Sequence, residues 1–89
     1  MAEVRLDAML ASYVPKRRLS SGARSVRALL DDLEGRYPKL RLRLRDEAEV
    51  VRPFVKIFVN GREVRPREDG GPRLGPRDEV DILHSIQGG

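Results

Sequence analysis

Cysteine is absent from this sequence of 89 residues. Its absence excludes disulfide bonds, a cysteine nucleophile, a thioester-forming thiol and any cysteine-based metal site. No apolar run approaches the roughly 18 residues of a membrane-spanning helix, and the early charges of Glu3, Arg5 and Asp7 are unlike a signal peptide. We therefore expect one small cytoplasmic domain that does not associate with membranes.

Aromatic residues are also scarce, with no tryptophan, two tyrosines and two phenylalanines. The net charge of +4 and a sequence pI near 10.1 would suit a nucleic-acid partner. However, the charges are largely interleaved, and too few aromatic residues are present for a base-stacking platform. We interpret the densest basic cluster, Lys16-Arg17-Arg18, as a solvated loop and do not expect nucleic acid as a partner.

The N-terminal third predicts two strands. From Val4 to Leu10 apolar and polar residues alternate, which is the period of a half-buried strand. A polar stretch from Ser12 to Arg18 can turn the chain back into a second strand, which Pro15 would make an edge or irregular strand. Ser20-Ser21-Gly22 is typical of a loop.

The next segment predicts a helix of about three turns. Ser25 can act as the N-cap by accepting a hydrogen bond from a free backbone N–H of the first turn. Pro38 ends the helix, because the residue before a proline is disfavoured in the helical region. The apolar stripe of this helix comprises Val26, Leu29, Leu30, Leu33 and Tyr37.

The segment from Leu40 to Arg45 permits two interpretations. Its alternation suits a strand, but a short helical turn that buries Leu40 and Leu44 fits equally well. The polar residues 46–49 then form a loop. Residues 54–59 predict a strand, Asn60-Gly61 a type I′ hairpin turn, and residues 62–65 the returning strand.

The rest of the chain predicts a long loop, a last strand and a tail. Glycines and prolines fill residues 66–76, which include Leu74, and residues 78–83 form the strand. After it, Gly88-Gly89 lack Cβ atoms and could enter a narrow channel of another protein. The alternative is an ordinary frayed terminus.

Strand parity predicts an exposed apolar surface near this tail. Val55, Ile57 and Val59 share one face, which we expect the helix to cover, so Phe54, Lys56 and Phe58 lie on the other. Leu83 lies opposite its core-facing neighbours Val80 and Ile82. We expect Phe54, Phe58 and Leu83 to contact a partner; the alternative is that arginine stems or loop residues cover them.

Together these segments resemble the MoaD/ThiS-type ubiquitin-like sulfur carriers over nearly the whole chain from Val4. The resemblance rests on the helix from Val26 to Leu33 followed by Arg36-Tyr37-Pro38 and Leu40, on Arg52–Val55 and Phe58–Arg62, and on Leu74, Asp78-Glu79-Val80, Ile82 and Gly88-Gly89. Two departures are Arg77, where many relatives have glycine, and Ser85-Ile86-Gln87 in place of a small apolar lead-in. Ile86 and Gln87 are therefore expected to tune partner recognition.

The resemblance implies an α+β fold of the ubiquitin-like β-grasp type: a mixed sheet with one main helix across it and an extended C-terminal Gly-Gly tail. Residues 1–84 would form the β-grasp domain and residues 85–89 a flexible reactive tail.

The resemblance also implies a carrier without catalytic side chains. A ubiquitin-activating-type adenylyltransferase would use ATP and Mg²⁺ to adenylate the Gly89 carboxylate, and a sulfur donor enzyme would convert it to a thiocarboxylate. A downstream synthase would accept the sulfur for a cofactor, an amino acid, a thionucleoside or another thio-metabolite. The chain itself would bind no cofactor or metal.

Two other functions stay open: a ubiquitin-like modifier linked through Gly89 to target lysines, and an RNA-binding β-grasp module with an inert tail. The lone His84 is interpreted as a solvated residue at a strand end, since no cysteine or evident serine partner accompanies it. Asp78, Glu79 and Asp81 are interpreted as turn and partner-contact residues rather than metal ligands.

Overall fold

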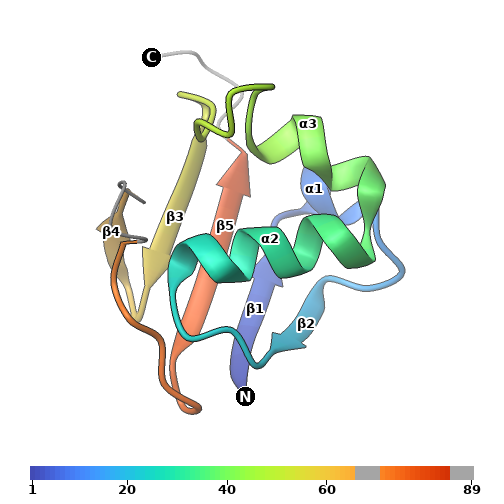
Figure 1. Cartoon of the computed structure of the whole chain (residues 1–89). Helices are drawn as coiled ribbons and strands as arrows, with labels where there is room; N and C mark the ends of the chain where they lie inside the picture. The colour runs from blue at the N-terminus through green and yellow to red at the C-terminus, as the bar shows by residue number, and fades with distance from the viewer. Residues whose placement is uncertain (66–70, 85–89) are drawn as a thin grey trace.

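One long helix lies across one face of a five-stranded mixed sheet in the computed structural model, which describes residues 1–65 and 71–84 (Figure 1). The strand order is β2-β1-β5-β3-β4; β1 and β5 are parallel, and the other neighbours are antiparallel. This arrangement confirms the predicted α+β class. The strands are β1 (Ala2–Leu6), β2 (Arg18–Ser21), β3 (Val55–Val59), β4 (Arg62–Val64) and β5 (Glu79–His84), and the helices are α1 (Ala8–Ala11), α2 (Val26–Arg36), the 3-10 helix η1 (Pro38–Leu40) and α3 (Arg41–Leu44).

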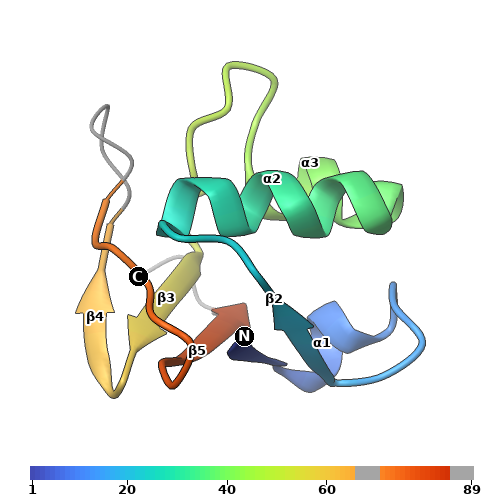
Figure 2. The same ribbon diagram turned by 60° about the horizontal axis from the view of Figure 1, so that its bottom comes forward.

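Helix α2 begins and ends where the sequence predicts. The hydroxyl of Ser25 accepts a hydrogen bond from the Ala28 amide at 3.1 Å, and Pro38 starts η1 directly after the helix. The predicted stripe faces the sheet: Val26, Leu29, Leu30 and Leu33 are buried, whereas Tyr37 is half-buried at the C-terminal end. Figure 2 shows this helix lying across the strands.

The core forms between α2 and the inward-facing residues of the three central strands. Its strand members include Val4 and Leu6 of β1, Val55 and Ile57 of β3, and Val80 and Ile82 of β5. Val59, predicted to lie on the same face, is only half-buried and packs against this cluster from the end of β3. Leu74 is buried in the same cluster and so anchors the loop that leads into β5.

The ambiguous segment from residue 40 is helical. Leu40 and Leu44 are buried on η1 and α3, which matches the helical alternative. The next residue, Arg45, is also buried: it donates to both carboxylate oxygens of Glu34 at 2.8 and 2.7 Å and to Asp31 at 2.7 Å. These carboxylates raise the pKa of Arg45. The bidentate pair fixes the end of α3 against α2.

The structure differs from the prediction in the first two strands. The first strand ends at Leu6 rather than Leu10, because Asp7 caps α1 and the chain turns helical. Ser20-Ser21 belong to β2 rather than to a loop. β2 is an edge strand, as expected, but Pro15 lies in the connection before it.

The predicted hairpin is confirmed. Asn60 and Gly61 have φ angles of 51° and 85°, which a type I′ turn requires. Because a glycine reaches this region without strain, the turn can be tight enough to pair Val59 with Arg62.

None of the helices within residues 1–65 and 71–84 combines the length and the apolar character that a membrane span needs.

Leu30→Ala should lower the free energy of unfolding by about 2–5 kcal/mol, because it opens a cavity under α2 where Leu30 is 1% exposed. Chemical denaturation followed by circular dichroism measures the loss. Arg27→Ala, on the exposed side of the same helix, serves as the control and should change stability by less than about 0.5 kcal/mol. Equal stabilities of the two variants would mean that the assigned core face of α2 is wrong.

Candidate functional site

The central strand β5 leads directly into residues 85–89. β1 pairs with one side of it and β3 with the other, and the register places Leu6 beside Ile82 and Val55 beside His84. The ladder with β1 ends at Ile82, and the last described residue, His84, still pairs with β3. Residues 85–89 follow this strand end in the sequence, so a chemical group bound to them is tethered to a fixed position in the fold.

Asp7 holds the end of β5. Its backbone N–H donates to the Ile82 carbonyl at 3.2 Å, and one carboxylate oxygen accepts from the His84 backbone N–H. The other oxygen accepts from the Leu10 N–H at 2.9 Å and so caps α1. One side chain thus ties the end of β1, the start of α1 and the end of β5 together. Sequence reasoning missed this role, although Asp7 is a preferred N-cap residue type.

His84 is not simply solvated, as the sequence interpretation had it. The residue is half-buried, its ring lies 4.8 Å from the Phe54 ring, and its Nδ1 atom is buried without a hydrogen-bond partner among the described residues. The imidazole is therefore a packed part of the end of β5, directly before residue 85 in the sequence. The structure brings no nucleophilic partner to it within the described part of the chain.

The face of the sheet opposite α2 carries the predicted apolar pair. Leu83 is 40% exposed and Phe58 is half-buried. Across β3 and β5, Lys56 lies beside Leu83 and Phe58 beside Asp81, so charged residues border both apolar side chains. We name the surface made by Phe58 and Leu83 with these neighbours the open face.

Ion pairs order the charges around the open face. Arg5 donates to Asp81 at 2.7 Å across the parallel pair, and this contact raises the pKa of Arg5. Lys56 and Glu63 lie 3.9 Å apart on β3 and β4. Exposed pairs of this kind stabilise proteins little. Their effect is to leave a polar rim around the apolar pair.

Phe54 does not share the open face, which corrects the parity argument. It precedes β3, packs against the core cluster and contacts the His84 ring. Parity fails here because alternation holds only within the strand, and Phe54 lies before Val55 in a turn. Phe54 lies instead beside His84 at the end of β5.

Asp78, directly before β5, and Asp81 within it both make contacts inside the domain. The Asp78 carboxylate accepts from the Gly75 N–H at 2.6 Å and from the Asn60 side chain at 2.9 Å, and these bonds lower the pKa of Asp78. Asp81 pairs with Arg5. Within the described ranges, no three His, Asp or Glu side chains gather into a possible metal site.

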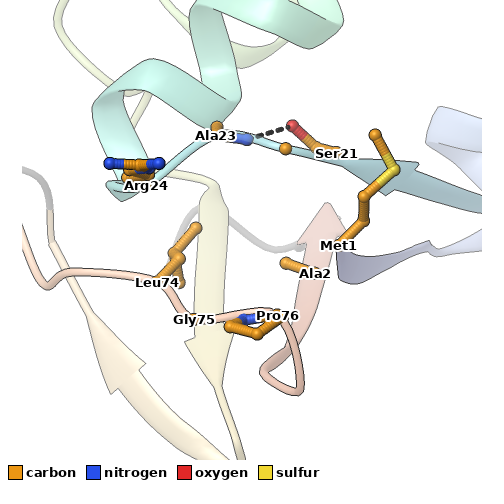
Figure 3. A pocket seen from close by; sticks show the side chains of 9 residues that line it. Met1, Ala2, Ser21, Ala23, Arg24, Leu74, Gly75 and Pro76 are labelled. Atoms are coloured by element: carbon orange, nitrogen blue, oxygen red, sulfur yellow. Dashed lines mark hydrogen bonds between the residues drawn. The ribbon is translucent and has the colours of Figure 1, made fainter.

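A cavity of about 420 Å³ lies at the opposite end of β5 from His84 (Figure 3). The start of β1, the residues before α2 and the loop before β5 line it, including Ala2, Ser21, Arg24 and Leu74. Because of this position the cavity does not adjoin His84.

The predicted site residues Ile86, Gln87, Gly88 and Gly89 lie outside the described residues.

The sequence model of the ThiS family matches residues 8–89. The chain belongs to the ThiS family. It is also 39% identical over 62 residues, 70% of this chain and 67% of the other, to the "Putative sulfur carrier protein" of Archaeoglobus fulgidus. The resemblance seen in the sequence is confirmed, and with it the role of a sulfur carrier.

Solved structures confirm the ubiquitin-like β-grasp fold. The small archaeal modifier protein 1 (SAMP1) of Methanosarcina acetivorans aligns with a TM-score of 0.85 at 24% identity, over 99% of this chain and 95% of that one. A chain of the BexX/CysO complex of Amycolatopsis orientalis aligns with a TM-score of 0.84 at 23% identity, over all of both chains.

Asp7→Ala should destabilise the domain by about 1–2 kcal/mol, because it removes the cap of α1 and leaves the His84 N–H without its acceptor. Hydrogen exchange of the Leu10 and His84 amides, measured by NMR, should accelerate more than exchange in β3.

Asp7→Asn keeps one side-chain carbonyl oxygen and should restore only one of the two hydrogen bonds. Unchanged exchange at both amides in Asp7→Ala would contradict the role assigned to this carboxylate.

Proposed function

We propose that the chain carries sulfur as a thiocarboxylate at Gly89 and is the substrate of an activating enzyme rather than an enzyme itself. The observation that carries this proposal is the position of His84. It ends a central strand, is bonded to Asp7 and packs on Phe54, so residues 85–89 extend from a rigid base toward a partner's reactive centre. Fixed geometry of this kind makes the following steps effectively intramolecular within the complex.

The chemistry requires an activated carboxylate. An adenylyltransferase of the ubiquitin-activating type, using ATP and Mg²⁺, would join the Gly89 carboxylate oxygen to the α-phosphorus as pyrophosphate leaves. Sulfide delivered by a sulfur donor enzyme would then attack the carbonyl carbon, and AMP would leave with the electron pair of the broken C–O bond. A downstream synthase would take the sulfur for a cofactor, an amino acid, a thionucleoside or another thio-metabolite.

The open face is the proposed docking surface for the activating enzyme. Phe58 and Leu83 supply apolar contacts within a charged rim, which is the composition of many interface centres. Phe54, beside the base, and Ile86 and Gln87, within the tail, would add contacts closer to Gly89. The structurally similar CysO is found in a complex with BexX, which supports a surface of this fold that binds another protein.

A second function, protein modification through Gly89, is supported by the likeness to SAMP1, a small archaeal modifier protein. Both functions begin with the same adenylate and differ in the attacking group, which is sulfide in one and a lysine amine in the other. Intact-mass analysis after incubation with activating enzyme, ATP and sulfide distinguishes them. Sulfur carriage exchanges one oxygen of the chain for sulfur, whereas modification gives an adduct on lysine.

Removal of Gly88-Gly89 should abolish adenylation and thiocarboxylate formation without loss of folding, because the buried core cluster of the described residues ends at Ile82. Thermal melts and intact-mass analysis make the two measurements. A variant with two alanines in place of the glycines keeps the length of the chain and tests the need for glycine at the reactive end. Sulfur transfer by the shortened chain at the normal rate would overturn the proposal.

Phe58→Ala and Leu83→Ala should each weaken binding to the activating enzyme by about 1–3 kcal/mol, as truncated interface residues do, with little loss of stability because neither lies in the buried cluster. Titration calorimetry measures the affinities, and thermal melts report the stabilities. Arg62→Glu on β4 is the control and should alter the salt dependence more than the affinity.

Unfolding of both alanine variants would place the two side chains in the core and would move the docking surface elsewhere.

A further inference from the structure

Strand β2 forms an outer edge of the sheet (Figure 1), and residues along this edge line a groove. The groove has a volume of about 460 Å³, and its lining residues come from β1, the segment before β2, β2 itself and the C-terminal end of α2. Its lining contains three cations and one acid: Lys16, Arg18, Arg36 and Glu3, together with the apolar or polar residues Leu19, Ser20 and Tyr37.

The backbone of β2 leaves hydrogen-bonding groups pointing into this groove. The Leu6 N–H donates to the Arg17 carbonyl at 2.9 Å, and antiparallel pairs alternate between hydrogen-bonded and non-hydrogen-bonded positions. Leu19 therefore directs its backbone groups toward β1, whereas Arg18 and Ser20 direct theirs outward. In the described part of the chain, the outward N–H groups of Arg18 and Ser20 have no partner.

Among the described residues, a side chain occupies one of these outward groups. The Ser20 carbonyl accepts from the Arg36 guanidinium at 2.8 Å, which also pairs with Asp32 at 3.1 Å and lies 5.6 Å from the centre of the Tyr37 ring. The side chains of Arg36 and Asp32 are 38% and 36% exposed. Pairs this exposed contribute little to stability, so a ligand N–H could replace Arg36 at the Ser20 carbonyl.

We propose that an extended acidic segment of a partner protein binds along β2 as an added strand. Its backbone would pair with the outward groups of Arg18 and Ser20, the mode of recognition in which a peptide extends a sheet edge. Its carboxylates would pair with Lys16, Arg18 and the released Arg36. Glu3, which lies 3.7 Å from Arg18, would disfavour an acidic residue beside it and so favour one register.

This binding mode differs from protection of the edge alone. Natural proteins often place cations along edge strands to prevent pairing with other chains, and this protection needs only charge. An added strand needs free backbone groups as well, and here both occur in the same groove. The surface is separate from Phe58 and Leu83, which lie on β3 and β5, so its failure would leave the sulfur-carrier proposal intact.

A short fluorescein-labelled peptide in which glutamate alternates with valine tests the proposal by fluorescence anisotropy. We expect binding that weakens with added salt, together with slower hydrogen exchange of the Arg18 and Ser20 amides. Two control peptides separate charge from strand pairing: one has lysine in place of glutamate, and one has N-methylated amides at alternate residues. Equal binding of the N-methylated peptide, or no binding of the first peptide at millimolar concentration, would overturn the proposal.

Matched variants locate the surface. Arg36→Glu should lower the affinity for the acidic peptide by about tenfold or more, whereas Arg62→Glu, the same charge change on the opposite edge strand β4, should lower it by less than about twofold. Ser20→Pro removes an outward N–H that β1 does not use, so it should prevent binding while the domain still folds. Circular dichroism confirms folding. Equal effects of Arg36→Glu and Arg62→Glu would show that net charge alone attracts the peptide.

Discussion

The parallel pairing of β1 with β5 at the centre of the sheet is the constraint on which the rest of the structure depends. It joins the first and last described strands, with Val4 beside Val80 and Leu6 beside Ile82, so the core cannot close until segments more than seventy residues apart have met. Because β3 pairs with the other side of β5 and continues to His84, β5 as a whole cannot leave the sheet without breaking two ladders. Asp7 extends the same pairing to His84. The pairing that completes the core therefore also fixes the position of His84, the last residue before 85–89.

The two faces of the sheet contribute differently to the stability of the fold. On the side of α2, each fully buried leucine, isoleucine or valine stabilises the fold by about 1.5–3 kcal/mol, whereas an exposed ion pair on the open face contributes about 0.2–1 kcal/mol. Substitutions on the open face are therefore tolerated by the fold, and this surface is available for recognition. On the buried side, Arg45 is an exception to this apolar composition. Its pairing with Glu34 offsets the cost of burying both charges and fixes the position of α3.

Helix α2, the hairpin and β5 could be predicted because each has a complete local signal: a cap and an apolar stripe, an Asn-Gly pair, and an alternating run. The end of β1 could not, because Ala8 and Leu10 continue the alternation of Val4 and Leu6 while Asp7 caps a helix. The contacts at the end of β5 could not be predicted either. The contact between Phe54 and His84, and the bond from His84 to Asp7, join segments distant in sequence, and no spacing within one segment encodes them. Leu83 was placed correctly because strand parity decides its face.

The open face and the diglycine are linked by free energy under the proposed function. Glycine loses more conformational entropy on ordering than any other residue, so holding Gly88-Gly89 in a partner's channel costs free energy that two residues without side chains cannot recover. Contacts made elsewhere must offset this cost. Phe58 and Leu83 are suited to do so, because they project from strands that are already ordered and lose little further entropy on binding. A rigid docking surface and a terminal diglycine without side chains are therefore complementary requirements of the proposed mechanism.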